Sequence, residues 1–574
     1  MKPILSVPCA LPLREFSIPS TWCIVVLGAF VWPLVTTCAR AQEPKPSSQS
    51  GAAEASTRAC TAPGFGSVHH PVKTASPEAQ RMFDRGMALD YGFNHNQAKR
   101  CFERAASLDP EMAMAYWGIA LVLGTNYNLP VDAEREKQAN AAIQQAVALS
   151  ARGPTNERDY IQALAKRYTD RSDPDYDSLE KAYHDAMREV YKRYPGDVDA
   201  AVLFAESGMN LHPWKLYDRD GNPAPGTEEI VSVLQSALKR DPSHLGANHF
   251  YIHAVEASAH PDLALPSAHR LAGLAPTSGH LVHMPAHIYI RTGDHEASEQ
   301  TNEAAARADE AYFAAAHPQG IYPMMYYSHN IHFIAVENAF LGNYADSLAA
   351  AKKVQQFVGP HVSEMNMLDA FYALPLEIMV RFHRWSEILA EPQSNASFAV
   401  SSCTWHFARA LAYANSGNLG QARTELAALH SVAPEMSKIQ INPVGMHNSD
   451  VIPQIMDHLV EAHIARAQKQ SADVLDHLRA AVALQDSMDY DEPPDWLYPI
   501  REPLGAALLQ AGKAAEAEAV FREDLRRNPN NPRSLFGLSE SLKERGSATE
   551  SAKVRQRFEK TWQKADTKLT LDQM

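Results

Sequence analysis

The sequence predicts an all-α protein built as a solenoid of repeated helix pairs. From Pro77 onward, apolar residues recur every three or four positions in segments of about 12–15 residues that end at Gly, Asn, Asp or Pro. Similar segments return 34 residues apart, as at Ala79 and Ala113. The chain of 574 residues also exceeds the roughly 250–300 residues at which a single core stops growing. A repeat array meets all three conditions.

The N-terminus has the pattern of a secretory signal. Lys2 and Arg14 precede an apolar run of 14 residues from Trp22 to Val35, and the small residues Ala39 and Ala41 indicate a cleavage site before Gln42. This run is shorter than the roughly 20 residues of a membrane-spanning helix. We therefore expect a signal peptide at 1–41 and export to the periplasm or the exterior. A lipid anchor at Cys38 and an uncleaved membrane anchor are the less favoured alternatives.

The remaining boundaries follow from composition. Residues 42–76 are rich in Pro, Ser, Gly and Ala and are expected to form a disordered leader. Helix pairs are expected over 77–566, followed by a flexible tail at 567–574.

Cysteine and charge content restrict the kinds of site and partner that the sequence is expected to have. Only Cys60, Cys101 and Cys403 follow the cleavage site. Because three is an odd number and they are widely spaced, we expect neither a disulfide framework nor a cysteine zinc site. We expect Cys101 to be a buried helix residue, while Cys60 is free to pair with a partner. The net charge of −14 argues against a nucleic-acid partner, because phosphates would be repelled.

Two segments share a pattern of small and aromatic residues. The first holds Gly86, Ala98, Phe102, Ala105 and Pro110, and the second holds Gly505, Gly512, Ala517, Phe521 and Pro529. Small residues permit two helices to cross closely, the aromatic residue fills the gap to the next pair, and Pro ends the second helix. The pattern resembles the tetratricopeptide repeat.

The resemblance implies a right-handed superhelical solenoid of about eleven to twelve helix pairs. The first helices are expected to begin near the following residues: Ala79, Ala113, Val198, Leu245, Gly279, Ser328, Asp369, Cys403, Ile455, Tyr498 and Pro532. Longer insertions are expected at 127–197, 211–241 and 304–327. Pro285 and Pro375 occupy interior positions of first helices, where proline removes a hydrogen bond and bends the helix.

Histidines gather in three consecutive first helices. Their spacing of three or four residues places each set on one helical face, and the resemblance implies that this face lines the concave groove. The eight candidate metal ligands are His249, His253, Glu256, His280, His283, His287, His329 and His332.

Neutral imidazole binds Zn, Cu, Ni and Fe well, and we expect a divalent transition metal, most readily Zn or Cu. Because the outer two helices are too far apart to share one ion, two groups are expected. The preferred grouping joins His249, His253 and Glu256 with His287, and His280 and His283 with His329 and His332.

Other functions remain open from the sequence. A protein, peptide or small-ligand scaffold without metal is one alternative, since such arrays usually bind partners in the groove. A metal-dependent hydrolase or oxidoreductase is a second, with Glu256 as a weak candidate for general base. Phosphate-binding loops, dinucleotide fingerprints, HExxH and Gly-x-Ser-x-Gly motifs are missing. Whether the chain is an enzyme, and its oligomeric state, are not decided.

Three segments near the histidines have two interpretations each. Residues 210–214 could cap the groove, residues 321–327 could form a Met-rich wall, and residues 489–502 could bind a ligand beside Trp496 and Tyr498. A structural turn, ordinary packing and a Pro-rich helix entry are the favoured interpretations.

Overall fold

The computed structural model describes residues 60–574 except 319 and 441–447. It is helical throughout this part, with no strand among the described residues. The expected signal peptide, its cleavage site after Ala41 and the alternative lipid anchor at Cys38 lie outside the described residues.

The first half of the described chain contains the following α-helices: α2 (Pro77–Asp90), α3 (His95–Leu108), α4 (Ala113–Leu123), α5 (Ala133–Ser150), α6 (Thr155–Leu164), α7 (Tyr176–Arg193), α8 (Val198–Met209), α9 (Thr227–Arg240), α10 (Leu245–Glu256), α11 (Leu265–Leu274), α12 (Gly279–His283), α13 (Pro285–Thr292) and α14 (His295–Ala316). The second half contains α15 (Ser328–Phe340), α16 (Tyr344–Val358), α17 (Asp369–Arg381), α18 (Trp385–Ala390), α19 (Ala399–Asn415), α20 (Leu419–Met436), α21 (Ile452–Ala467), α22 (Ser471–Gln485), α23 (Arg501–Gln510), α24 (Ala514–Arg527), α25 (Pro532–Glu544) and α26 (Ala548–Thr561). Short helical turns are η1 (Pro261–Ala264), the π-helical η2 (Tyr322–Tyr327), η3 (Gly359–His361), η4 (Asn366–Leu368), η5 (Asn448–Asp450) and η6 (Leu571–Gln573).

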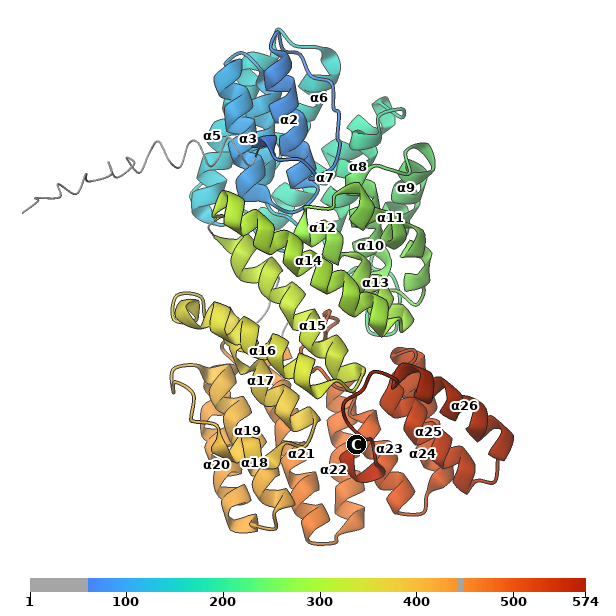
Figure 1. The fold of residues 1–574 in the computed structure, drawn as a ribbon. Coiled ribbons are helices and arrows are strands. Elements are labelled where there is room, and N and C mark those ends of the chain that lie inside the picture. Colours follow the sequence, from blue (N-terminus) through green and yellow to red (C-terminus); the bar gives the residue numbers. More distant parts are fainter. Residues whose placement is uncertain (1–59, 319, 441–447) are drawn as a thin grey trace, which may run out of the picture. The chain divides into compact units, whose positions relative to one another are not determined.

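Each helix packs against its successor, which gives twelve consecutive pairs over the described residues when α12 and α13 count as one first helix (Figure 1). This confirms the predicted all-α solenoid and its number of pairs. Seven of the residues predicted to begin a first helix are the first residue of a helix in the structure: Ala113, Val198, Leu245, Gly279, Ser328, Asp369 and Pro532. The predicted insertions consist largely of helices, since 127–197 contains α5, α6 and α7.

The repeated spacing of glycine and phenylalanine has a direct packing cause. The ring of Phe102 lies against Gly86 in the first pair and Gly118 in the next, and a Cβ on either glycine would overlap that ring. Phe521 packs against Gly505 and Gly537 in the same way. One aromatic ring therefore joins two successive pairs, because the glycines leave room for it.

The two interior prolines behave differently. α12 ends at His283 and α13 begins at Pro285, because proline lacks the N–H that would continue the helix. Pro375 lies inside α17 without ending it. The interruption at Pro285 falls in the middle of the histidine-bearing helix.

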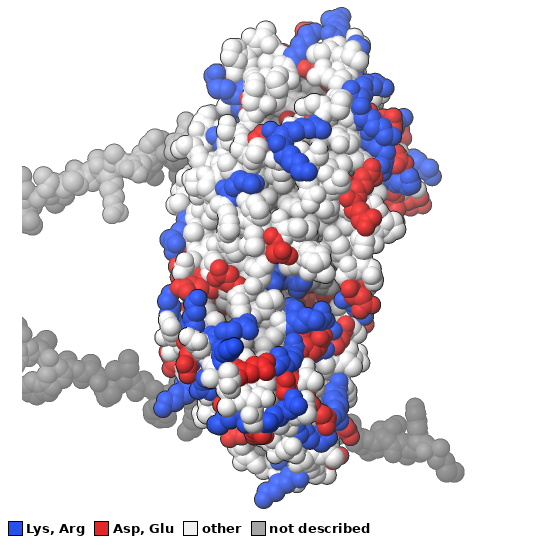
Figure 2. All heavy atoms as spheres, turned by 90° about the vertical axis from the view of Figure 1, so that its right-hand side faces the viewer, with Lys and Arg blue, Asp and Glu red and all other residues white. Residues whose placement is uncertain are grey.

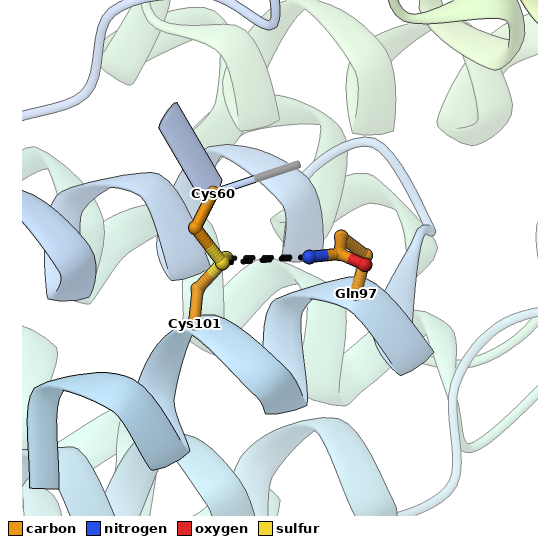
Figure 3. Close-up of a disulfide and its surroundings, with 3 residues drawn as sticks. All are labelled: Cys60, Gln97 and Cys101. Atoms are coloured by element: carbon orange, nitrogen blue, oxygen red, sulfur yellow. Dashed lines mark hydrogen bonds between the residues drawn. A yellow bond between two sulfur atoms is a disulfide. The ribbon is translucent and has the colours of Figure 1, made fainter. Parts of the chain in front are cut away.

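The segment before the first repeat is packed, so the expectation of a disordered leader is wrong for its described part, 60–76. Cys60 forms a disulfide with Cys101 of α3, with Cα atoms 5.6 Å apart, and Gln97 Nε2 donates to Cys60 Sγ at 3.4 Å (Figure 3). Phe65 is buried, and Nδ1 of His70 lies 2.8 Å from a carboxylate oxygen of Asp199 in α8. The expectation that no disulfide forms is also corrected, because α3 presents Cys101 toward this segment.

The C-terminal tail is likewise packed rather than flexible over 567–574. Thr567 Oγ1 donates to the carbonyl of Gly342 at 2.7 Å, and Met574 is buried. The Asp566 carboxylate accepts hydrogen bonds from the backbone N–H groups of Tyr344 and Ala345 at 2.8 and 2.9 Å. The chain end therefore returns to the loop between α15 and α16.

Within the described part of the chain, every helix is too short or too polar to cross a lipid bilayer.

Candidate metal centre

The predicted histidines converge in a buried cluster. α10 supplies His249 and His253, α12 and α13 supply His280, His283 and His287, and α15 supplies His329 and His332. The first five are at most 2% exposed, whereas the last two are half-buried. Such burial is unusual for five imidazoles together, because each polar ring nitrogen then requires a partner.

The cluster consists of two groups of three. In the first group, one donor nitrogen each of His249, His253 and His280 lies within 4.8 Å of the others. Nε2 of His280 is 3.1 Å from Nε2 of His249. In the second group, His283, His287 and His329 satisfy the same limit, and Nε2 of His287 is 2.8 Å from Nε2 of His283.

These two groups combine the histidines differently from the predicted groups, so the predicted division of the ligands into two sets is wrong. Neighbouring first helices are offset by about one turn, so the fifth position of one helix meets the second position of the next. His249 therefore meets His280, and His283 meets His329, with ring centroids 4.9 and 4.7 Å apart. His332 lies outside both groups, and its ring packs on Phe371 at 5.6 Å.

Glu256 belongs to the support of the cluster rather than to its inner surface. Nδ1 of His253 donates to Oε1 of Glu256 at 2.7 Å, and Nδ1 of His287 donates to Oε2 at 2.5 Å. Burial alone would raise the pKa of Glu256, but the charges and hydrogen bonds of His287 and His253 outweigh it and lower the pKa to about 2. One carboxylate thus orients a histidine from each group.

Two further partners fix the other rings. Nδ1 of His249 donates to the backbone carbonyl of Tyr91 at 2.7 Å. Nδ1 of His283 donates to Oδ1 of Asn302 at 2.6 Å, and the amide of Asn302 is oriented because its Nδ2 donates to the carbonyl of Ser298. Sequence analysis missed both partners, since a backbone carbonyl has no sequence signature and Asn302 is one of many polar residues in α14.

The hydrogen bonds determine which ring nitrogens carry protons. His249, His253, His283 and His287 each donate from Nδ1, so in the neutral rings every Nε2 presents a lone pair. These Nε2 atoms face the interior of the cluster. Nε2 of His253 and Nδ1 of His280 are buried without a hydrogen-bond partner among the described residues. The cluster thus presents several unprotonated nitrogens to a common centre.

Electrostatics favour the neutral rings. Burial, followed by repulsion from neighbouring histidines, holds the pKa values of His249, His280, His283 and His329 well below the usual range. Burial also lowers the pKa of His332 to about 4. Neutral imidazole is the form that binds metals.

Two aromatic residues in left-handed backbone conformations pack on the cluster. Phe93 has φ +55° and stacks on His253 and His280, with centroids 5.9 and 5.3 Å away. Trp214 has φ +59°, lies 5.8 Å from His253, and donates from Nε1 to Asn128 Oδ1 at 3.0 Å. Bulky residues seldom adopt positive φ, and such strain gathers at functional sites.

A cavity of about 210 Å³ adjoins the cluster. His253, His280, His287 and His329 form part of its wall, which continues over η2, α17, α19 and the loop before α23. Residues 210–214, 321–327 and 489–502, for which the sequence allowed two interpretations, all contribute to this cavity. Trp214, Met325 and Trp496 line it.

A third group of potential ligands is already satisfied. Asp199 accepts hydrogen bonds from His70, His244 and Tyr91, while Asp197 accepts one from Tyr160. These contacts account for the proximity of His70, Asp197 and Asp199 without an ion.

The family comparison agrees with the repeat geometry. A tetratricopeptide repeat model matches residues 79–112, which span α2 and α3. The chain therefore contains a tetratricopeptide repeat at these residues. A comparison with curated proteins finds no match.

Three solved structures match this chain at low sequence identity and low TM-score. Human IFIT1 bound to m7Gppp-AAAA is 13% identical with a TM-score of 0.33, over 88% of this chain and 94% of that one. The APC/C hetero-tetramer Cut9–Hcn1 is 13% identical with a TM-score of 0.29, over 81% and 76%. The TPR domain of P58(IPK) is 12% identical with a TM-score of 0.20, over 82% and 99%.

Proposed function

We propose that this protein binds one or two transition-metal ions in its buried histidine cluster. The observation that carries the proposal is the pair of Nε2 atoms of His283 and His287, 2.8 Å apart, each with its Nδ1 already donating a hydrogen bond. Two facing lone pairs repel each other unless a cation lies between them. A proton there would charge His287, and the Glu256 carboxylate at 2.5 Å would balance that charge. Nε2 of His253 and Nδ1 of His280 would still lack partners among the described residues.

The supporting shell has the form expected around metal-binding imidazoles. Such rings usually donate their second N–H to a carboxylate, amide or backbone carbonyl, which orients them. Glu256, Asn302 and the carbonyl of Tyr91 supply all three kinds of acceptor. Because the acceptors come from three separate parts of the chain, packing of core side chains alone does not require this arrangement.

Neutral nitrogen ligands favour zinc or copper over magnesium or calcium. Two nitrogens about 2.0–2.1 Å from one tetrahedral ion lie roughly 3.3 Å apart, close to the 2.8 and 3.1 Å between Nε2 atoms here. Such an ion supplies Lewis acidity, or electron transfer in the case of copper. His249, His253 and His280 would hold one ion, and His283, His287 and His329 the other.

The test is elemental analysis of the full chain purified without a polyhistidine tag. We expect one or two ions of zinc or copper per chain, and loss of the second-group ion from a His283→Ala, His287→Ala double variant. The matched control is a His260→Ala, His269→Ala double variant, which removes two exposed histidines near the same helices and should retain the metal.

A metal-free wild type that also takes up neither zinc nor copper at micromolar concentration would overturn the proposal. Circular dichroism of each variant distinguishes loss of ligands from loss of fold, because the remaining helix pairs should preserve the helical signal.

Binding of a protein or peptide is the second candidate function, because tetratricopeptide repeats are typical partner-binding scaffolds. On the face drawn in Figure 2, acidic and basic side chains are interspersed. This mixture is compatible with a protein partner and gives phosphate backbones little attraction. The absence of a nucleic-acid partner remains a prediction.

The enzyme alternative is supported by the cavity beside the cluster. Glu256 suits a positioning role better than that of general base, because both carboxylate oxygens accept bonds from histidines and the residue is 1% exposed.

Export is proposed on the N-terminal pattern and is supported by the Cys60–Cys101 disulfide, which is typical of oxidising compartments. N-terminal sequencing of the exported protein should begin at Gln42.

A further inference from the structure

The cavity beside the histidines is lined by acidic side chains. Glu377 of α17, Glu492 and Asp495 line it, together with Asp491, and the cavity wall includes no Lys or Arg among the described residues. The carboxyl group of Glu377 has no hydrogen-bond or ion-pair partner within the described chain. Burial, followed by the nearby Asp495, raises the pKa of Glu377 to about 8. Burial likewise raises the pKa of Glu492 to about 8, although Arg291 partly opposes it.

A second polar group in the same wall is unsatisfied. Thr404 of α19 is 0% exposed, and its hydroxyl has no partner in the described structure. A buried hydroxyl without a hydrogen bond costs about 1–3 kcal/mol. This cost needs an explanation, and a ligand in the adjoining space would remove it.

The rest of the cavity wall is apolar and rich in aromatic rings. Phe371, Phe407 and Trp496 contribute to it, beside Met325 and Met367. Aromatic faces attract organic cations, and thioether side chains adapt to ligands of varied shape. The volume of about 210 Å³ is below the roughly 300–1,000 Å³ of pockets for drug-sized molecules, so the ligand must be small.

We propose that this cavity binds a small organic ammonium compound, with its cation beside Glu377 and its apolar body against Phe371, Phe407 and Trp496. An ammonium group beside Glu377 stabilises the ionised form of that carboxyl group, and the Thr404 hydroxyl gains a partner. A carboxylate ligand of the same size is repelled by Glu377 once that residue is ionised, above its pKa of about 8. The residues that line the cavity are sufficient to support the proposed ligand site. Only the placement of the ligand next to a metal rests on the proposed metal centre.

The test compares three probes of similar shape by isothermal titration calorimetry at about pH 9, above the pKa of about 8 of Glu377: phenethylamine, neutral 2-phenylethanol and anionic 3-phenylpropanoate. We expect phenethylamine to bind at least about tenfold more tightly than either of the others, as expected for a favourable against an absent or repulsive charge contact. Equal affinities, a preference for the anion, or no heat from phenethylamine at millimolar concentration would each overturn the proposal.

Two variants locate the site. Glu377→Gln should reduce the preference for the amine over the alcohol to about threefold or less, whereas Glu364→Gln, at a side chain that is 82% exposed, should leave it unchanged. Thr404→Val, which keeps the side-chain shape, should weaken phenethylamine severalfold and provides a second test if the Glu377 variant does not fold. A preference that survives both substitutions would contradict the proposal.

The titrations are repeated on metal-loaded protein, on protein treated with a chelator, and on the His283→Ala, His287→Ala variant. Amine selectivity that persists without metal supports the cavity site independently of the metal centre. Metal binding without amine selectivity overturns the cavity site and leaves the metal proposal intact.

Discussion

Single side chains decide whether the histidine cluster can hold a metal. The decisive residue is Glu256, because its two oxygens accept hydrogen bonds from His253 in one group and His287 in the other. Each of these bonds fixes a tautomer in which Nε2 is free to bind. Supporting acceptors of this kind commonly contribute 10–100-fold to metal affinity.

Glu256→Gln is therefore predicted to weaken metal binding by about 10–100-fold. A glutamine side chain offers one acceptor oxygen and one NH₂ donor, so either His253 or His287 must face a donor and change its tautomer or orientation. Competition titration with a chromogenic chelator measures the change. Glu337→Gln is the matched control, because Glu337 forms an equally buried 2.7 Å bond with His295 away from the cluster; its metal affinity should equal that of wild type.

The candidate site was predicted in part from the sequence. Spacing within each helix identified the histidines that converge, since residues three or four apart share a face. Pairing between helices was not predictable, because the offset that brings His249 to His280 depends on packing across the interface. The Tyr91 carbonyl and Phe93 were missed for a similar reason, since both belong to a turn that reaches the cluster only in the folded chain.

At the scale of elements, the packed segment 60–76 adds a layer before the first repeat. It is attached to α3 by the Cys60–Cys101 disulfide and to α8 by the buried His70–Asp199 pair. Thr277 N–H also donates to the carbonyl of Gly64 at 3.1 Å. The segment therefore links α3 of the first pair to α8 and to the turn before α12.

The His70–Asp199 pair predicts a pH dependence for this element. Burial alone would raise the pKa of Asp199, but hydrogen bonds from His244 and His70 lower it well below the usual range. Burial would lower the pKa of His70, but Asp199 outweighs it and raises that pKa. The shifted pKa of Asp199 adds to the free energy of unfolding above the unfolded pKa of about 3.9, and this gain is lost as pH falls through the folded pKa. The shifted pKa of His70 adds to the free energy of unfolding below its unfolded pKa of about 6.5, and this gain is lost as pH rises through the folded pKa.

Asp199→Asn should therefore lower the thermal midpoint most between about pH 4 and 6.5, with a cost of roughly 3–5 kcal/mol for leaving buried partners unpaired. Thermal denaturation followed by circular dichroism across this range provides the measurement. Asp457→Asn is the control, because Asp457 forms a 2.5 Å pair with His430, which is 56% exposed. A constant difference between Asp199→Asn and wild type at every pH would contradict the prediction.

At the scale of the described chain, repeat register was the most predictable property. Helix openings at Ala113, Leu245 and Pro532 follow from local spacing, because every pair must bury the same small and aromatic positions. The disulfide and the packed tail were not predicted, because both depend on contacts between segments far apart in sequence. Length alone could not indicate that Asp566 bonds to the backbone near residue 345.

Gly342→Ala tests the return of the chain end. Gly342 has φ +79°, and a Cβ there would overlap the ring of Trp562, which follows α26. Gly417→Ala is the matched control, because Gly417 has φ +78° but open space around it. In both variants the left-handed backbone lowers the free energy of unfolding by roughly 1–2 kcal/mol. Only Gly342→Ala should lose additional stability in urea denaturation, because only there does the Cβ overlap another residue. Equal losses would show that the contact with Trp562 contributes nothing.

Repeat arrays usually change length readily in evolution and in the laboratory, because each unit contacts only its neighbours. Here Asp566 and Thr567 are bonded to the loop between α15 and α16, so the number of pairs that follow α16 is constrained. Inserting or deleting a pair between α17 and α26 would shift the last helix away from that loop. Unlike an open array, this protein should tolerate substitution within a repeat far better than duplication of one.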